Sequence, residues 1–343
     1  MNFCTLTSKK RVVTSLFSIL FLLVLFNFSL HYYVKVKTTK EYYVTDKFSK
    51  IKHYQLNQNN DDIVFIGSSR TLFGISTKVF EDFGLQVYNL GMQAMQFEEY
   101  PSTLGVIINN KPKLVVVSLT IDKLYEELNI PKYPSSEELE ILEKVDTVKY
   151  LQSIYRYLLN FNYFYTYSEA IYNKIKVFYK KFNYTSRSKS EYLSNNNSSD
   201  HLVDGCNIIN KQISGNRVNI KCDNGDGILF DNSISLDSYE YKVIKNLDQL
   251  NIDSVDYLKY FLNKILKKGI NVTLVLEPIS NIEYKYDLSQ VEKSFNNVNI
   301  IDLSSFYMER TMWADDGHLN SQGREFYSKK LYNSINFNKN ITR

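Results

Sequence analysis

The chain has 343 residues, 44% hydrophobic and 23% charged, which is ordinary globular composition and enough length for one large domain, or one domain with an insertion. Its 41 basic and 37 acidic residues are mixed along the chain and leave a formal net charge of +4. Because the sequence contains no basic block of the kind that nucleic-acid binding requires, we exclude nucleic acid as a partner.

An apolar segment near the N-terminus, VVTSLFSILFLLVLFNFSL at 12–30, contains no charged residue. As a helix, its nineteen residues span about 28 Å, close to the roughly 30 Å apolar core of a bilayer. A signal peptide would have a shorter apolar region, of about 7–15 residues, and then a small-residue cleavage site, which SLHYYVKVK does not provide. We therefore predict one uncleaved transmembrane helix over 12–33, preceded by a cytoplasmic tail at 1–11.

The orientation of this anchor depends on two further features. A basic cluster at 9–11 is matched by three lysines at 35–40, so the count of positive charges on the two sides is close to a tie. Cys206 and Cys222 lie sixteen residues apart in a polar segment, and they either form a disulfide in an oxidising compartment or are two unrelated thiols. Together these features favour a single-pass cell-membrane protein with an extracytoplasmic globular domain.

Downstream of a juxtamembrane spacer at 34–60, short apolar runs alternate with helical patterns. The expected strands lie at 62–67, 85–91, 112–120, 270–278 and 298–304. The expected helices lie at 77–83, 97–110, 135–182, 238–268 and 321–336, the last capped by Asn320 or Ser321. Because strands that alternate with helices imply right-handed crossovers and a parallel sheet, we predict an α/β domain over 61–336.

An insertion at about 135–235 interrupts this alternation. Its first part, 135–182, is rich in aromatic residues, whereas 183–235 is rich in Ser, Asn, Asp and Gly and is expected to be partly mobile. The run CDNGDG at 222–227 is similar to part of a calcium loop, but the twelve-residue pattern with a terminal glutamate is missing, so a solvated turn is expected. The insertion either covers the site or contacts the membrane.

The first expected strand ends abruptly. In DDIVFIGSSR, at 61–70, the apolar run stops at Gly67, and Ser68 and Ser69 follow where the backbone turns. In an open α/β sheet, ligands bind at the carboxyl ends of the strands. A serine at this place is either a helix cap or a nucleophile.

A second polar motif, MWADDGHLNSQG at 312–323, follows the last expected strand. It places Asp315 three residues before His318, the only one of the four histidines that follows a strand of the predicted sheet. Histidine accepts a serine proton near neutral pH, and a carboxylate fixes its tautomer and stabilises the imidazolium. Taken alone, Asp315 and His318 are also compatible with a surface turn. Together with the serine motif, they predict a Ser-His-Asp triad.

Three segments, FIGSSR, NLGMQ and DDGHLNSQG, resemble the first, second and fifth blocks of the SGNH (GDSL-like) hydrolases. The order of elements over 60–336 is also similar to that of the superfamily. The resemblance implies a flavodoxin-like, three-layer α/β/α sandwich with a parallel five-stranded sheet. Within the superfamily, the chain looks most like membrane-anchored proteins that modify cell-surface polymers, namely teichoic acid D-alanine transfer proteins and polysaccharide O-acetyltransferases and esterases.

The resemblance also implies roles for single residues. Because the GSS of FIGSSR aligns with the family's Gly-Asp-Ser, the nucleophile falls on Ser69. His318 is then the base and Asp315 its orienting partner. The backbone N–H groups of Ser69 and Gly91 would form part of the oxyanion hole.

The third block departs from the family pattern, which carries an asparagine that donates to the oxyanion. Here the third strand is followed by Thr120, whose hydroxyl can donate, and by Asp122, whose carboxylate cannot. This departure counts against efficient general esterase activity, and it is compatible with a specialised transferase or with a site completed by substrate or partner. Arg70, next to the nucleophile, either binds an anionic substrate group or pairs with an acidic neighbour.

The predicted function is a membrane-anchored serine O-acyltransferase or esterase. It would act through an acyl-enzyme on an acetyl or D-alanyl ester of a bacterial cell-surface glycopolymer. No metal or cofactor is expected, and a membrane-bound acyltransferase is a candidate partner. The alternative is a non-catalytic SGNH-like subunit that supports such an acyltransferase or binds polysaccharide.

Overall fold

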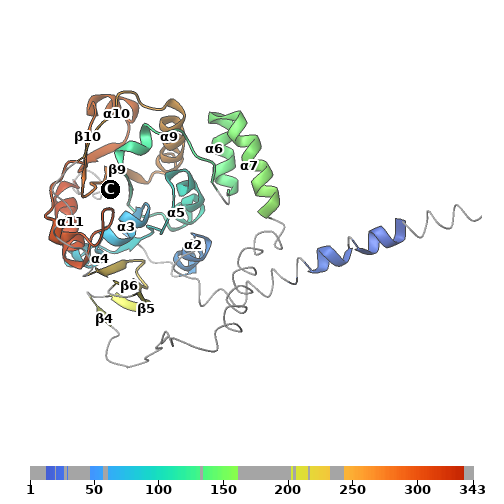
Figure 1. Ribbon diagram of the computed structural model, residues 1–343, viewed down its shortest axis with the longest axis horizontal. Coiled ribbons are helices and arrows are strands. Elements are labelled where there is room, and N and C mark those ends of the chain that lie inside the picture. The colour runs from blue at the N-terminus through green and yellow to red at the C-terminus, as the bar shows by residue number, and fades with distance from the viewer. Residues whose placement is uncertain are drawn as a thin grey trace, which may run out of the picture. The chain divides into compact units, whose positions relative to one another are not determined.

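The computed structural model describes residues 13–19, 21–26, 29, 47–56, 61–131, 134–160, 202–203, 206–214, 217–231 and 243–335. The chain divides into two compact units, Met1–Tyr42 with Ile154–Asn196 and Tyr43–Ser153 with Asn197–Arg343. The second unit contains a central α/β domain and a small inserted sheet (Figure 1).

A five-stranded parallel sheet forms the centre of the second unit. Its strand order is β11-β9-β3-β1-β2, and every neighbouring pair is parallel. The strands are β1 (Ile63–Ile66), β2 (Val87–Asn89), β3 (Leu114–Leu119), β9 (Asn271–Leu276) and β11 (Asn299–Asp302). The predicted α/β fold with a parallel five-stranded sheet is confirmed, and each strand lies within the range expected from its apolar run.

Side chains of the strands alternate between two hydrophobic cores. Val64 and Ile66 belong to one core and Ile63 and Phe65 to the other, because successive residues of a strand point to opposite faces. Burial on both faces explains why these strands are continuous apolar runs instead of alternating patterns. Helices therefore pack against both faces of the sheet (Figure 1).

The helices divide between the two cores. The first core includes residues of α2 (Lys47–Leu56), η1 (Phe97–Thr103), α5 (Leu104–Asn110), α6 (Ser136–Val145), α9 (Ile252–Leu266) and α10 (Leu288–Ser294). The second core includes residues of α4 (Thr77–Glu81) and α11 (Ser321–Ser334). Asn320 caps α11, because its side chain accepts the N–H of Gly323.

The helix expected at 238–268 is wrong over its first part. Val243–Asn246 form strand β8, which pairs in parallel with β10 (Ile282–Lys285). The helix α9 starts only at Ile252, because the side chain of Asn251 accepts the N–H of Ser254 and caps the first turn. Residues 238–242 lie outside the described residues.

The spacer expected at 34–60 contains part of the domain. The helix α2 lies within this range, and Tyr54 is 1% exposed in the first core. Lys50, which is also buried, donates to the carbonyl oxygens of Gly91 and Gly225. Residues 47–56 are therefore packed as a helix of the α/β domain.

The insertion forms regular structure where it is described. Its aromatic part contains α6 and α7 (Thr147–Asn160), and residues 161–182 lie outside the described residues. Its polar part forms a four-stranded antiparallel sheet of β4 (Leu202–Val203), β5 (Cys206–Ser214), β6 (Arg217–Cys222) and β7 (Gly227–Asp231). This sheet is called the inserted sheet below.

The sequence analysis expected no strand within 183–235, so it missed these four strands. In RVNIKC, Val218, Ile220 and Cys222 alternate with polar residues and contribute to a small core, which is the pattern of a strand with one buried face. Cys222 is disulfide-bonded. Cys206 begins β5, two residues before Ile208, which pairs with Cys222.

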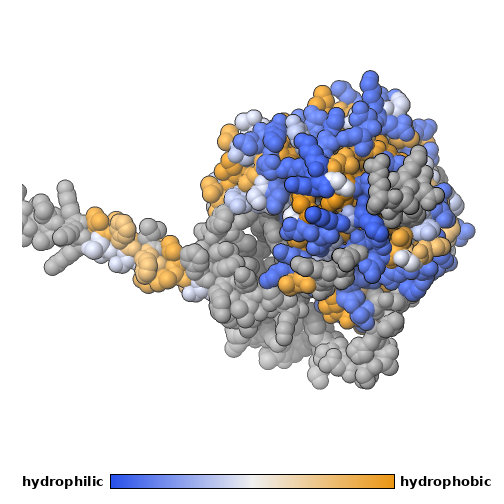
Figure 2. All heavy atoms as spheres, turned by 180° about the vertical axis from the view of Figure 1, so that it is seen from behind, coloured by the Kyte–Doolittle hydropathy of each residue, from blue (hydrophilic) through white to orange (hydrophobic). Residues whose placement is uncertain are grey.

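The apolar N-terminal segment is described at residues 13–19, 21–26 and 29, where the backbone is helical. Its large apolar side chains are exposed (Figure 2), with Leu16 and Phe17 exposed by 61% and 71%. Among the described residues, no helix is both long enough and apolar enough to cross a membrane.

Candidate active site

The serine motif forms the end of a strand, a sharp turn and a short helix. Ser68 is the N-cap of α3 (Ser69–Gly74), and its side chain accepts the N–H of Arg70 at 3.3 Å. Gly67 permits the turn, because a Cβ at this position would lie 1.8 Å from a side-chain oxygen of α3. The helix-cap expectation is therefore confirmed for Ser68, whereas Ser69 is the first residue of the helix and its hydroxyl is available for another contact.

Ser69 and the Asp-x-x-His motif meet beside the carboxyl end of β1. The Oγ of Ser69 lies 2.8 Å from Nε2 of His318, and Nδ1 of His318 lies 2.8 Å from both carboxylate oxygens of Asp315. Because a carboxylate only accepts hydrogen bonds, Nδ1 carries the proton, and Nε2 is left to accept from Ser69. The structure thus brings the three predicted residues together in the order that a serine triad requires.

Backbone groups hold the carboxylate of Asp315 in place. The N–H groups of Gly317 and His318 donate to its Oδ1 at 2.9 and 2.8 Å. Burial by itself raises the pKa of Asp315, but the hydrogen bond and charge of His318, the N–H of Gly317 and the charge of Arg217 outweigh it. The pKa of Asp315 therefore lies well below its usual range, and an ionised carboxylate is present at neutral pH to stabilise an imidazolium at His318.

The strand order places the site at a topological switch point of the sheet. The chain passes from β1 to β2 on one side and then crosses to β3 on the other side of β1. In open α/β sheets, ligands bind outside the carboxyl ends of the strands at such a point. Ser69 follows β1 and Thr120 follows β3, so both residues lie at this edge. Thr120 is buried there as the N-cap of η2 (Ile121–Leu124).

The oxyanion role expected for Gly91 is not supported by its contacts. Its N–H already donates to Oδ1 of Asn89 at 2.9 Å. A Cβ at Gly91 would lie 2.5 Å from the backbone nitrogen of Leu72, so the glycine allows the end of β2 to pack closely against α3. By contrast, the N–H of Ser69 has no acceptor among the described residues, and it remains the backbone donor next to the nucleophile.

A small cavity, lined by apolar groups and a few polar side chains, lies beside the nucleophile helix. Its volume is about 20 Å³, and it is lined by Arg70, Gly74, Glu277, Pro278, Trp313, Gly317, Leu319 and Tyr327. Within the described residues, three buried polar atoms of this lining have no hydrogen-bond partner: Nε of Arg70, Oε2 of Glu277 and the hydroxyl of Tyr327. A cavity of this size with three polar partners is suited to one ordered water molecule.

Glu277 is a site residue that the sequence analysis missed. It directly follows β9 and accepts a hydrogen bond from Thr71 of α3 at 2.8 Å. Burial raises the pKa of Glu277 to about 7, against the opposing effects of the Thr71 hydrogen bond and the Arg70 charge. Arg70 therefore has an acidic neighbour, although the described residues show no direct ion pair between them. In the sequence, Glu277 could have been noticed as the acidic residue that directly follows the apolar run INVTLVL.

Replacement of Glu277 by glutamine is expected to remove a pH dependence of stability. The folded-state pKa of about 7 lies above the ordinary value of 4.5, so the folded state binds more protons than the unfolded state between these values. Stability from this group is therefore lost as pH rises through that window. As the pH is raised from 5 to 8, the free energy of unfolding of Glu277→Gln should increase by about 2 kcal/mol relative to that of the wild type. Urea unfolding of both proteins at pH 5 and pH 8 measures these free energies. If the difference between variant and wild type is the same at both pH values, the prediction is contradicted.

The inserted sheet reaches the site through Arg217. Its Nη2 lies 2.9 Å from Oδ2 of Asp315. Arg217 and Asp315 are 98 residues apart in the chain, so no local pattern pointed to this pair. A second guanidinium, that of Arg310, donates to the backbone carbonyl of Asp315 at 3.2 Å.

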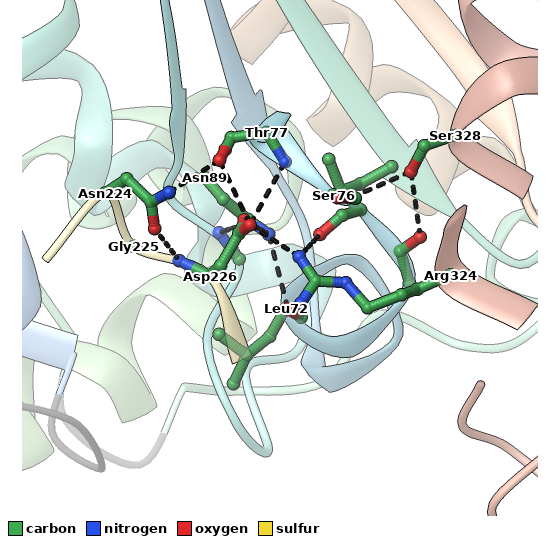
Figure 3. Close-up of polar contacts among 12 residues, drawn as sticks. Leu72, Ser76, Thr77, Asn89, Asn224, Gly225, Asp226, Arg324 and Ser328 are labelled. Atoms are coloured by element: carbon green, nitrogen blue, oxygen red, sulfur yellow. Dashed lines mark hydrogen bonds and ion pairs between the residues drawn. The ribbon is translucent and has the colours of Figure 1, made fainter. Parts of the chain in front are cut away.

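The turn between β6 and β7 is anchored in the α/β domain by Asp226 (Figure 3). Its carboxylate accepts hydrogen bonds from the backbone and hydroxyl of Thr77, from Asn89 and from Arg324. A Cβ at Gly225, whose φ is +86°, would lie 2.0 Å from the carbonyl oxygen of Asn89. The expected solvated turn is therefore wrong, because Asp226 is 3% exposed and is paired with a buried cation.

No protein-family model, curated protein or solved structure matches this chain. Across the ranges that the structure describes, no group of three or more His, Cys, Asp or Glu side chains is placed to hold a metal ion. Function is therefore inferred from the geometry of Ser69, His318 and Asp315 and from the motifs that contain them.

Proposed function

We propose that the chain is a membrane-anchored, SGNH-like serine O-acyltransferase or esterase. Its substrate would be an ester-linked acyl group, acetyl or D-alanyl, of a bacterial cell-surface glycopolymer. The observation that carries this proposal is the hydrogen-bonded order of Ser69, His318 and Asp315, with 2.8 Å at each step. The parallel sheet with helices on both faces supports the three-layer, flavodoxin-like fold that the resemblance implies. The exposed fractions of the His318 and Asp315 side chains, 24% and 32%, leave the site open to a polymer.

The proposed cycle has two half-reactions. In the first, Oγ of Ser69 attacks the ester carbonyl carbon while Nε2 of His318 accepts the hydroxyl proton, and Asp315 stabilises the imidazolium. The imidazolium then gives the proton to the leaving oxygen, so an acyl-enzyme and a free hydroxyl remain. In the second, His318 takes a proton from a sugar hydroxyl or water as its oxygen attacks the acyl carbon. The imidazolium then returns the proton to Oγ of Ser69 as that bond breaks, which releases the new ester or the free acid and restores Ser69. The cycle needs neither a metal nor a cofactor.

The N–H of Ser69 is the donor that this geometry offers to the oxyanion of each tetrahedral intermediate. A single donor of this kind is typically worth about 2.7–4 kcal/mol of transition-state stabilisation. The hydroxyl of Thr120, at the same edge of the sheet, is proposed as the second donor, in place of the asparagine of the third block.

We place this domain outside the cytoplasmic membrane, behind an anchor at 12–33 and a cytoplasmic tail at 1–11. The uncharged run at 12–30 and its exposed apolar side chains support the anchor. The disulfide at Cys222 supports an oxidising compartment, because disulfides persist in extracytoplasmic proteins and are rare in the cytosol. A membrane-bound acyltransferase remains the proposed partner that would supply or receive the acyl group.

Labelling of the full-length chain with a fluorophosphonate probe tests the proposal. An activated serine should be modified, and mass spectrometry should place the adduct on Ser69. Ser69→Ala is the control that locates the adduct, and transfer of acetyl from an activated ester to an added sugar separates the transferase from the esterase. An unlabelled chain whose circular dichroism spectrum shows a folded protein contradicts a catalytic role.

The second candidate function is a non-catalytic subunit that binds polysaccharide or supports a membrane acyltransferase. Two observations favour it. The N–H of Gly91 is occupied by Asn89, and the third block has Thr120 in place of an asparagine. An oxyanion hole with few donors would slow acyl transfer. Binding of a glycopolymer by a chain that the probe does not label would select this candidate.

A further inference from the structure

The inserted sheet supplies a side chain that contacts the triad directly. We propose that Arg217 is a positioning residue of the triad, and that through it the inserted sheet is part of the catalytic site. This inference rests on the proposed function, because it assigns Arg217 a role in the reaction of Ser69. It also gives the insertion a function that its polar sequence did not indicate.

The two oxygens of the Asp315 carboxylate are held in different ways. Oδ1 accepts the backbone N–H groups of Gly317 and His318, as well as Nδ1 of His318. Oδ2 lies near Nδ1 of His318 and accepts from Nη2 of Arg217 at 2.9 Å. The described part of the chain provides no other donor to Oδ2. Backbone donors on Oδ1 alone leave the carboxylate free to rotate. Arg217 therefore fixes this rotation through Oδ2, and with it the orientation of the imidazole.

The strand that carries Arg217 is held at both ends. Arg217 is the first residue of β6 and pairs with Ser214 of β5 and Asp231 of β7. At the other end, Cys222 is disulfide-bonded. The turn that follows is held by buried Asp226, so the end of β6 opposite Arg217 is anchored in the α/β domain.

A second contact of β6 with the triad passes through Phe73. The buried ammonium of Lys221 lies over the Phe73 ring, 5.0 Å from its centroid. Phe73 in turn packs edge-on against the imidazole of His318, with ring centroids 5.4 Å apart. The inserted sheet thus contacts the carboxylate directly and the base through Phe73, which agrees with a structural element that sets their relative orientation.

The charge of Arg217 also has a consequence for His318. The carboxylate of Asp315 is shared between the guanidinium and the ring, so Arg217 takes up part of the negative charge that would stabilise an imidazolium. The other charged or titratable groups near this loop include Arg310, which contacts Asp315 and the carboxylate of Asp316, and Arg70, which lies beside Gly317. They also include Lys221, which lies over Phe73, and Glu277, whose carboxyl group lines the same cavity as Gly317. Replacing Arg217 by a neutral side chain leaves these groups in place, so the protonated ring becomes more stable.

The test is the pH profile of Ser69 modification by the fluorophosphonate probe, measured on the full-length chain between pH 5 and pH 9. Arg217→Gln should lower the plateau rate of modification roughly tenfold, because the triad is less well oriented. It should also move the acid limb, the fall in rate towards low pH, to higher pH by about 0.5 unit. Arg217→Lys should restore the position of the limb and part of the rate, because the positive charge returns. Lys211→Gln, which removes the same charge from an exposed position of β5, should match the wild type.

Three results would overturn the inference, and they are distinguishable. If the plateau rate and the position of the acid limb in Arg217→Gln equal those of the wild type, the guanidinium has no role in positioning the triad. A lower plateau with an unmoved limb, not rescued by lysine, would show that Arg217 only stabilises the fold. If the wild-type chain itself is folded but unlabelled at Ser69, both this inference and the proposed function fail together, whereas the first two results leave the proposed function standing.

Discussion

Replacement of His318 by alanine is expected to lower the rate of Ser69 acylation by roughly 10⁴- to 10⁶-fold. In the structure, Nε2 of His318 is the proton acceptor that lies 2.8 Å from Oγ of Ser69. Without it, the hydroxyl must lose its proton to water, and serine is a weak nucleophile in that state. The rate is measured as the burst of p-nitrophenol from p-nitrophenyl acetate, with the acylated residue identified by mass spectrometry.

Two control variants make this measurement specific. Ser69→Ala should reduce the burst of p-nitrophenol to the same residual level as His318→Ala, because nucleophile and base act as a unit. His53→Gln removes a histidine that contacts Tyr88 from α2 and lies outside the triad, so it should retain the wild-type burst. If His318→Ala loses less than about tenfold in rate, His318 is not the base, and the non-catalytic candidate gains support.

Replacement of Asp226 by alanine is expected to destabilise the protein by about 3–5 kcal/mol. The side chains of Asp226 and Arg324 are 3% and 2% exposed, so the substitution leaves a buried guanidinium without its counter-charge. It also removes the acceptor for the backbone and hydroxyl of Thr77. The free energy of unfolding, from urea denaturation of wild type and variant, measures the loss.

An exposed ion pair provides the matched control for Asp226. Glu325 and Lys329 are both 58% exposed on α11, so Glu325→Ala should cost less than about 0.5 kcal/mol. Asp226→Asn keeps the shape of the side chain and removes its charge. A destabilisation smaller than that of Asp226→Ala would separate the contribution of the charge from that of the hydrogen bonds. A loss below about 1 kcal/mol for Asp226→Ala would mean that the anchor contributes little.

These predictions share a structural cause, because the inserted sheet and the triad are connected through β6. Asp226 holds the turn after this strand, and Arg217 at its start contacts Asp315. We therefore expect Asp226→Ala to impair acylation of Ser69 even at temperatures where the α/β domain is folded. The insertion is in this respect an integral part of the site.

The sequence by itself determined the central sheet and the residues that compose the triad. Buried strands are continuous apolar runs, and this signal is local, so all five strands were located within their expected ranges. The carboxyl ends of parallel strands lie at one edge, which is why polar motifs after the first and last strands predicted that Ser69, Asp315 and His318 would meet. The local signal failed at 243–246, where β8 forms instead of a helix.

Only the tertiary structure decided which side chains complete and support the site. Arg217 and Asp315 are 98 residues apart, as are Asp226 and Arg324, and neither pair follows a local period. The use of the Gly91 N–H by Asn89 likewise depends on how closely β2 approaches α3. Hydrophobic periodicity records which face of an element is buried, but ion pairs between distant segments depend on how those elements pack, and this information is not contained in any short stretch of sequence.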